Sequence, residues 1–186
     1  MQYTHHPGFV LWFTGLSGAG KTTISQALEA ILRERGVRVE RLDGDTVRQH
    51  LTKDLGFSKA DRDTNIERVT FVAKLLSRNN VGVLAAFISP YRYMRDRVRT
   101  ETTNFIEVYV DAPLETCIRR DVKGMYAQAL AGKIENFTGI NDPYEPPEKP
   151  DIHLRTDRET LEESVAKVLE YLEQRALIPV DEPSAR

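Results

Sequence analysis

The chain has 186 residues, of which 40 % are hydrophobic and 29 % are charged, and its single cysteine, Cys117, excludes an intrachain disulfide. Its net charge of −2 is too close to zero for binding nucleic acid by bulk charge, and no apolar run approaches the roughly 20 residues that span a bilayer, so neither a nucleic acid nor a membrane is an expected partner. Since the chain begins without a basic segment and an apolar stretch, we expect a cytoplasmic domain over residues 1–178 and a C-terminal tail over residues 179–186.

The first half of the chain predicts two strands and two helices. Residues 9–14 are a short apolar run typical of a buried strand, and residues 22–34 carry the apolar stripe of a helix. Residues 37–42 alternate between apolar and polar side chains and predict a second strand. Ser58 and Asp61 have the spacing of a capping box, which predicts the start of another helix.

The second half continues this alternation. Residues 81–88 are almost wholly apolar, as expected for a central parallel strand that is covered on both faces. The next predicted elements are a helix and two strands, residues 91–102, 105–110 and 152–154. Thr156 and Glu159 again have capping-box spacing, before a last helix. This order predicts an α/β protein with a parallel five-stranded sheet and helices on both faces.

Residues 123–150 interrupt the alternation. They contain three glycines and four prolines and show little periodicity. A connection of this length inside a compact domain is usually functional, so we interpret it as a mobile lid.

The strongest motif follows the first strand. Its residues match G-x-x-x-x-G-K-[ST] in full and are Gly15, Leu16, Ser17, Gly18, Ala19, Gly20, Lys21 and Thr22. In this context the glycines let backbone N–H groups point at phosphate oxygens, Lys21 reaches the β- and γ-phosphates, and Thr22 holds Mg²⁺. The alternative is a chance glycine turn, but the strand before the motif and the helix after it favour a P-loop NTPase fold that binds ATP.

Two carboxylates follow the second strand. Asp43 and Asp45 are expected at the carboxyl edge of the sheet, where ligands of such sheets bind. A carboxylate there can hold Mg²⁺ or take a proton from an acceptor hydroxyl. The alternative is a turn with capping aspartates, since Asp45 precedes a possible short helix at Thr46, and the spacing does not separate the two.

Further candidates lie in the helix that follows and in the loops. One candidate group is suited to binding a doubly charged oxyanion, and the alternative is that it forms a solvated basic face. Its members are Arg48, Arg62, Asn65 and Arg68. Phe57 and Phe137 could enclose a planar base or serve as local packing anchors.

Ser89 ends the central strand. It is either a phosphate ligand, a phosphorylated nucleophile, or the N-cap of the next helix with Pro90 at the first helical position. The four histidines show no metal pattern and are interpreted as structural or surface residues.

Taken together, these segments resemble the adenylylsulfate kinase (APS kinase) family. The markers, in chain order, are GLSGAGKTT, LDGD, DLGF, R-x-x-N, AAFISPYR, KGMY and FTGINDPYEPP, from about Trp12 to Leu154. The resemblance implies that ATP phosphorylates the ribose 3′-hydroxyl of adenosine 5′-phosphosulfate (APS), giving 3′-phosphoadenosine 5′-phosphosulfate. It also implies Mg²⁺ and a homodimer.

The resemblance assigns roles residue by residue. It places ATP on Gly15–Thr22 and Thr23, with Lys21 on the transferring phosphate, and Mg²⁺ at Thr22 and Asp45. Asp45, Lys21 and Ser89 are the implied catalytic residues. The implied APS contacts are Asp43, Asp45, Arg48, Phe57, Arg62, Asn65, Ile88, Ser89, Lys123 and Phe137. Within this set the arginines and Asn65 clamp the phosphosulfate, and the two phenylalanines enclose the adenine.

Three residues in or beside the expected lid depart from the family pattern, namely Val122, Leu130 and Asn141. Two other functions are alternatives: another small-molecule P-loop kinase, such as a shikimate kinase, or a nucleotide-binding regulatory module without turnover.

Overall fold

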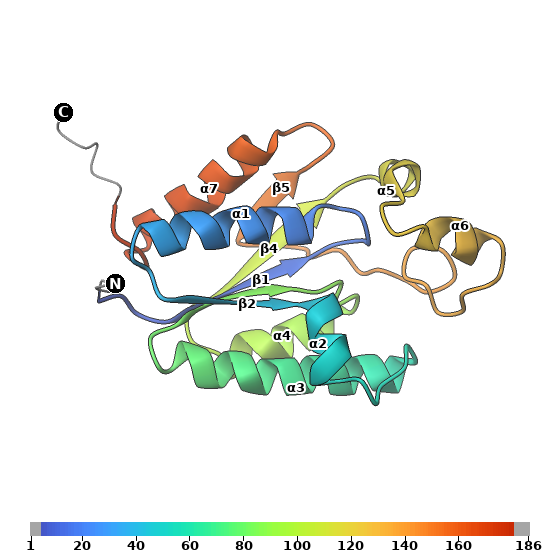
Figure 1. Cartoon of the computed structure of the whole chain (residues 1–186), viewed down its shortest axis with the longest axis horizontal. Helices are drawn as coiled ribbons and strands as arrows, with labels where there is room; N and C mark the ends of the chain where they lie inside the picture. The colour runs from blue at the N-terminus through green and yellow to red at the C-terminus, as the bar shows by residue number, and fades with distance from the viewer. Residues whose placement is uncertain (1–4, 181–186) are drawn as a thin grey trace.

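The five predicted strands form one parallel sheet. The computed structural model describes residues 5–180, so residues 181–186 of the expected tail lie outside the described residues. The strands are β1 (Phe9–Thr14), β2 (Val39–Asp43), β3 (Gly82–Ala86), β4 (Phe105–Asp111) and β5 (Ile152–Arg155). Their order across the sheet is β2-β3-β1-β4-β5, and every neighbouring pair is parallel (Figure 1). The predicted fold class is therefore confirmed.

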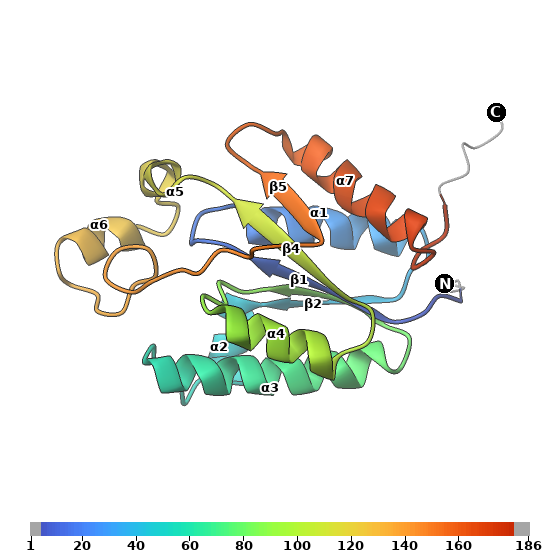
Figure 2. The same cartoon turned by 180° about the vertical axis from the view of Figure 1, so that it is seen from behind.

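Helices cover both faces of the sheet. On one face lie α1 (Lys21–Glu34) and α7 (Leu161–Gln174), and on the other lie α3 (Lys59–Ser77) and α4 (Arg92–Glu101), as Figures 1 and 2 show from opposite sides. Alternate residues of a strand point to opposite faces. In β1, Phe9 joins the core under α1 and α7, while its neighbour Val10 joins the core under α3 and α4. This strand is buried throughout because both of its faces are covered.

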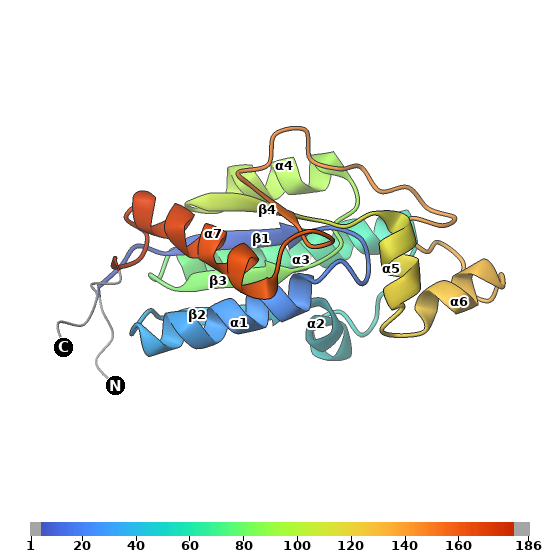
Figure 3. The same ribbon diagram turned by 90° about the horizontal axis from the view of Figure 1, so that it is seen from above.

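Three short helices lie at the carboxyl ends of the strands: α2 (Gly44–His50), α5 (Leu114–Arg120) and α6 (Met125–Leu130). Figure 3 shows α5 and α6 extending beyond the edge of the sheet. α5 has no counterpart among the predicted elements, and α6 lies within residues 123–150, where the sequence shows little periodicity. The Asp121 carboxylate accepts hydrogen bonds from the backbone N–H groups of Tyr126 and Ala127, which caps α6 from outside its own sequence.

Two of the predicted helix starts have different outcomes. Ser58 caps α3 by accepting a hydrogen bond from the Asp61 backbone N–H, as expected. The prediction for the last helix was wrong by one turn, because Thr160 and Glu163 form the capping box of α7. Thr156 makes tertiary contacts instead, since its hydroxyl donates to the Ala19 carbonyl at 2.7 Å.

Within residues 5–180, no helix is both long and apolar enough to cross a membrane.

Candidate active site

One cavity of about 570 Å³ opens at the carboxyl ends of the strands, between the loop after β1, the ends of β2 and β3, and the segment that carries α5 and α6. The predicted site residues that line it are Ser17, Gly18, Ala19, Gly20, Lys21, Thr22, Thr23, Asp43, Asp45, Arg48, Phe57, Arg62, Asn65, Ile88, Ser89, Lys123 and Phe137. Gly15 and Leu16 do not line it, and Leu16 lines a second hollow beside β4. The structure therefore brings together residues that are up to 120 positions apart in the chain.

The glycine-rich loop joins β1 to α1. Gly15 has a φ of 150°, and a Cβ built there would lie 2.2 Å from the Val110 carbonyl oxygen, so only glycine fits. Gly20 is the N-cap of α1 at a φ of 111°, in the left-handed region that glycine adopts without strain. Residues in the first turn of α1 line the cavity, and the N-terminus of a helix favours an anion there.

Lys21 is a buried cation at the base of the cavity. Its side-chain Nζ donates to the carbonyl oxygens of Gly15 at 2.9 Å and Leu16 at 2.7 Å. Burial lowers the pKa of Lys21 to about 8. A buried ammonium that is bonded to neutral carbonyls has a strong preference for an anionic partner.

The capping alternative was wrong in its residue, because Asp43 rather than Asp45 precedes the helix, which begins at Gly44 and not at Thr46. Asp43 caps α2, since its Oδ1 accepts from the Asp45 backbone N–H at 3.0 Å. The other oxygen of Asp43 accepts from the Thr22 hydroxyl at 2.9 Å. Asp43 therefore ties the end of β2 to the start of α1, and it is Asp43 rather than Asp45 that contacts Thr22.

The second carboxylate projects into the cavity. Asp45 forms an ion pair with Lys123, which lies in the turn between α5 and α6. Both side chains are at least half exposed, at 63 % for Asp45 and 50 % for Lys123. Exposed ion pairs contribute little to stability, so this contact leaves the Asp45 carboxylate available to a ligand.

Two arginines converge beside α3. Arg62 is buried, donates to the Phe57 carbonyl at 3.0 Å and forms an ion pair with Asp142 at 2.9 Å. The pKa of Arg48 is lowered by burial and also by the positive charge of Arg62. Because these guanidinium groups repel each other, an anion placed between them would be favoured.

Asn65 is buried on the same face of α3, and its side-chain oxygen accepts from the Thr52 hydroxyl at 2.8 Å. Arg68 lies outside the cavity, because its guanidinium pairs with Asp54 at 2.7 Å on the surface. The basic-face alternative is therefore correct for Arg68, whereas Arg48 and Arg62 face the cavity.

The two phenylalanines differ in environment. Phe57 is 54 % exposed, and the Arg48 guanidinium lies 4.3 Å from its ring centroid. Phe137 is buried and packs edge-on against Tyr126, with the ring centroids 4.9 Å apart. Phe137 is thus a packing anchor that also lines the cavity, and enclosure of a base between the two rings stays a prediction.

Ser89 does not cap a helix. β3 ends at Ala86, and α4 begins at Arg92 with Tyr91 at its N-cap, so Pro90 is not at the first helical position. Ser89 is buried, has a φ of 40°, and accepts a hydrogen bond from the Trp12 indole N–H at 3.0 Å. The preceding carbonyl, that of Ile88, accepts from the Thr14 hydroxyl at 2.7 Å.

Four further residues that the sequence analysis missed as site residues border the phosphate loop. Arg120 donates to the Gly18 carbonyl at 3.2 Å, and the Tyr126 hydroxyl donates to the Ser17 carbonyl at 2.9 Å. Thr156 and Thr160 complete this wall of the cavity. A weak signal existed for Arg120, which directly follows another arginine at the end of the segment after the fourth strand. Tyr126 belongs to the family marker KGMY, and no local pattern marked Thr156 or Thr160 as site residues.

Comparisons with known proteins agree on one family. The family described as adenylylsulphate kinase matches residues 7–155. A probable adenylyl-sulfate kinase of Pseudomonas aeruginosa is 77 % identical over 164 residues, which is 88 % of this chain and 77 % of the relative. The adenylyl-sulfate kinase of Halothermothrix orenii is 62 % identical over 175 residues, which is 94 % of this chain and 95 % of the relative.

A solved structure has the same fold. The Mycobacterium tuberculosis APS kinase CysC, in complex with AMPPNP and APS, superposes with a TM-score of 0.87 at 43 % identity. The match covers 91 % of this chain and 99 % of the other.

Proposed function

Because this chain belongs to the adenylylsulphate kinase family, we propose that its cavity transfers the γ-phosphoryl group of ATP to the ribose 3′-hydroxyl of APS. The products are ADP and 3′-phosphoadenosine 5′-phosphosulfate. One observation carries this function: the phosphate loop from Ser17 onward and a pair of converging arginines face the same cavity of about 570 Å³. The first suits the phosphates of ATP, and the second suits the phosphosulfate of the acceptor.

ATP occupies the side of the cavity formed by the loop after β1. Its phosphates lie against the backbone of residues 15–20 and the N-terminus of α1, where the helix dipole favours negative charge. Phosphate oxygens replace the Gly15 and Leu16 carbonyls as acceptors for the buried Lys21 ammonium. This exchange gives Lys21 an anionic partner and positions its positive charge beside the phosphoryl group during transfer.

APS occupies the opposite side. Arg48, Arg62 and Asn65 bind the phosphosulfate, which carries more than one negative charge and matches guanidinium geometry. The adenine lies against Phe57, whose ring is exposed, and is bounded by Phe137. Ile88 and Ser89 form the floor of this side of the cavity, and Lys123 contacts the acceptor from the lid.

The reaction is a direct in-line transfer. The 3′-oxygen of APS attacks the γ-phosphorus as the bond from that phosphorus to the β,γ-bridging oxygen breaks, and ADP leaves with the electron pair. Asp45 accepts the hydroxyl proton, since its carboxylate is exposed to the cavity and is paired only with Lys123 across it. Closure of residues 123–150 over the substrates excludes water, which would otherwise accept the phosphoryl group.

The residues present fit Mg²⁺. This ion takes one or two carboxylates together with substrate phosphates and water, rather than a cage of protein ligands. Thr22 and Asp45 would hold it, with Asp43 orienting the Thr22 hydroxyl at 2.9 Å. When bound, Mg²⁺ neutralises charge on the phosphates. No cluster of three or more His, Cys, Asp or Glu suited to a metal occurs in the part of the chain that the structure describes.

ADP release with ATP and Mg²⁺ tests the function. We expect turnover with APS and none above background with AMP or shikimate as the acceptor. ATP binding without turnover on any acceptor would overturn the kinase assignment in favour of a regulatory module.

Ser89→Ala should lower kcat by roughly 3- to 30-fold and leave a measurable rate. The buried Ser89 hydroxyl is engaged by Trp12, and a direct transfer needs no phosphoserine intermediate. Steady-state kinetics at saturating ATP and APS measure this. Activity at background in a variant that still binds ATP would contradict it and would support an obligatory phosphoserine.

ATP binding should weaken in alkaline solution. Since the pKa of Lys21 is about 8, the free protein loses this positive charge as the pH rises through that value, and the Kd for ATP should increase about tenfold per pH unit above about 9. Isothermal titration calorimetry measures the change. Lys21→Met has no group that titrates there and should bind ATP weakly without this dependence. A wild-type Kd that stays constant over the same range would contradict the role of Lys21.

The single sheet supports one kinase domain, residues 1–178, with a lid over about 123–150. The homodimer that the family resemblance implies is measured by light scattering in solution.

A further inference from the structure

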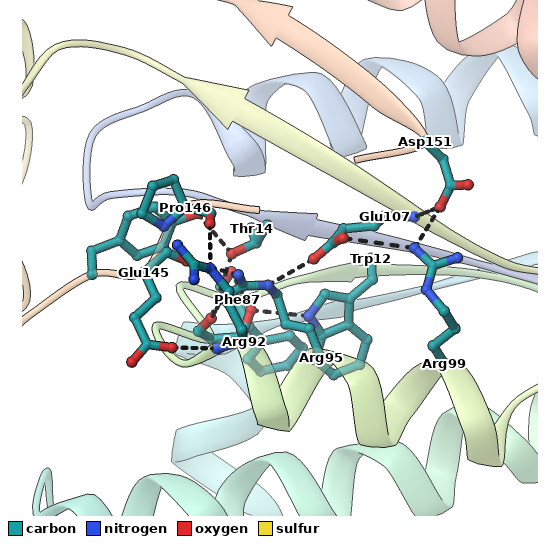
Figure 4. A network of polar contacts seen from close by, with 12 residues as sticks. Trp12, Thr14, Phe87, Arg92, Arg95, Arg99, Glu107, Glu145, Pro146 and Asp151 are labelled. Carbon is teal, nitrogen blue, oxygen red and sulfur yellow. Dashed lines mark hydrogen bonds and ion pairs between the residues drawn. The ribbon is translucent and has the colours of Figure 1, made fainter. Parts of the chain in front are cut away.

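A buried guanidinium lies behind the floor of the cavity. Arg95 in α4 is 2 % exposed, and its Nε donates to the Glu107 carboxylate of β4 at 2.7 Å. Its two other nitrogens donate to backbone carbonyls, Nη1 to Ser89 at 2.6 Å and Nη2 to Glu145 at 2.7 Å. Figure 4 shows Arg95 between Glu107 and Glu145. One side chain therefore joins the sheet, the loop after β3 and the segment that returns from the lid. The kinase mechanism above does not use it.

The contact with Ser89 acts on a residue in an unusual conformation. A φ of 40° is uncommon for a residue with a side chain and persists only where the surroundings hold it. Trp12 binds the Ser89 hydroxyl, and Arg95 binds the Ser89 carbonyl at 2.6 Å, to which the Thr14 hydroxyl also donates over a longer 3.5 Å. Because Ser89 lines the cavity, the position of its backbone sets the shape of the cavity floor.

The contact between Arg95 and Glu145 holds the last part of the lid, residues 142–150, against the loop after β3. The Glu145 backbone N–H donates to the Pro90 carbonyl at 2.8 Å, and the Glu145 carboxylate accepts from the Arg92 backbone N–H at 2.8 Å. Three residues earlier, Asp142 pairs with Arg62 at 2.9 Å. The segment that Arg95 anchors therefore also holds one of the two arginines that face the acceptor.

The charges around Arg95 explain why the group is an arginine. The Glu107 carboxylate is almost buried, and its second oxygen lies 3.6 Å from Arg99. A lysine would keep the positive charge opposite Glu107. Its single ammonium could not also donate to the Ser89 and Glu145 carbonyls, which the planar guanidinium reaches in fixed directions. Arginine is thus required by the geometry of the two carbonyls, and the charge is required by Glu107.

From these contacts we infer that Arg95 is a positioning residue for the acceptor. It holds the Ser89 loop and the returning lid segment in one arrangement, and so sets the affinity for APS without touching either substrate. ATP lies on the loop after β1, to which Arg95 makes no hydrogen bond, so its affinity does not depend on Arg95. This inference rests on the proposed function, because it assigns the Ser89 side of the cavity to APS.

Arg95→Lys tests the inference, with Arg99→Lys as the matched control. Arg99 is on the same helix and also faces Glu107, but it bonds Asp151 at 2.8 Å rather than Ser89 or Glu145. We expect Arg95→Lys to raise the KM for APS at least about tenfold and to leave the KM for ATP within about twofold of wild type. Arg99→Lys should leave both KM values within about twofold.

The fluorescence of Trp12 gives a second readout, since it is the only tryptophan in the chain and its indole N–H binds Ser89. Arg95→Lys should shift the emission maximum, and Arg99→Lys should not. Unchanged emission together with a raised KM for APS would show that Arg95 does not act on APS binding by positioning the Ser89 loop. A wild-type KM for APS, or parallel increases in both KM values, would overturn the positioning role altogether.

Turnover of APS by the wild type and by Arg95→Lys distinguishes failure of the proposed function from failure of this inference. If the wild-type protein shows no turnover with APS, the proposed function fails; if wild type turns over APS and Arg95→Lys matches it, only the inference fails. Should Arg95→Lys not fold, the double variant Arg95→Met/Glu107→Gln removes both buried charges, and the same KM split is expected from it.

Discussion

Replacing Lys21 with alanine should lower kcat at saturating ATP and APS by at least about 100-fold, which corresponds to about 3 kcal/mol of transition-state stabilisation. The physical reason is the position of the ammonium. Lys21 is buried at the base of the phosphate loop and bonded only to the Gly15 and Leu16 carbonyls, so it can turn to the transferring phosphoryl group without losing an anionic partner. A charge in a site from which water is excluded interacts more strongly than one in solution.

A coupled assay for ADP measures this loss, and calorimetry shows whether ATP still binds. The control is Lys53→Ala, which removes an exposed lysine outside the cavity and should change kcat by less than about twofold. Both Lys21→Ala and Lys21→Met remove the two hydrogen bonds from Lys21 to the loop. Alanine also removes most of the side-chain volume, whereas methionine keeps it, so Lys21→Met should lose as much activity without leaving a cavity. A rate for either variant within about tenfold of wild type would exclude Lys21 from stabilising the transition state.

Asp45→Asn should lower kcat by about 100- to 10,000-fold, the range expected when a general base is removed, while the Kd for ATP changes little. Asparagine keeps the shape of the side chain but cannot accept the 3′-hydroxyl proton or bind Mg²⁺ as strongly. Of the two aspartates it is Asp43 that accepts from the Thr22 hydroxyl, so the loop itself should keep its structure. The measurements are steady-state kinetics and ATP titration.

This substitution also breaks the ion pair between Asp45 and Lys123. Lys123→Met breaks the same pair and keeps the carboxylate, so it separates the two effects. We expect Lys123→Met to raise the KM for APS with a much smaller loss in kcat than Asp45→Asn. Equal losses in kcat would assign the effect to the ion pair. Asp96→Asn, on the exposed face of α4, controls for the loss of one negative charge.

The spacing of Asp43 and Asp45 predicts where the two carboxylates lie but not the contacts that each one makes. The sequence placed both carboxylates at the end of a strand, and the structure puts them at the predicted edge of the sheet. The capping alternative rested on Asp45, which precedes Thr46. Asp43 is the cap instead, because its Oδ1 accepts from the Asp45 backbone N–H, and its second oxygen reaches Thr22 only because β2 and α1 are packed together.

Thr156 and Thr160 show the same limit at a helix start. Both threonines are followed three residues later by glutamate, so the local pattern fits each of them equally. The Thr156 hydroxyl is taken by the Ala19 carbonyl, which lies 137 residues earlier in the chain. Packing of β5 beside the phosphate loop therefore moves the start of α7 by one turn.

The parallel sheet, the phosphate loop and the family could be predicted because they depend on patterns within a few residues: apolar runs, capping spacings and an eight-residue motif. Which side chains those residues contact depends on the packing of the helices on the sheet. Arg95 belongs to a helix that was predicted, yet its partners lie 6, 12 and 50 residues away. Likewise Phe137 is buried in the core, where Tyr126 packs edge-on against it. Contacts between segments that are distant in sequence are set by how the helices close on the sheet, and no local pattern carries that information.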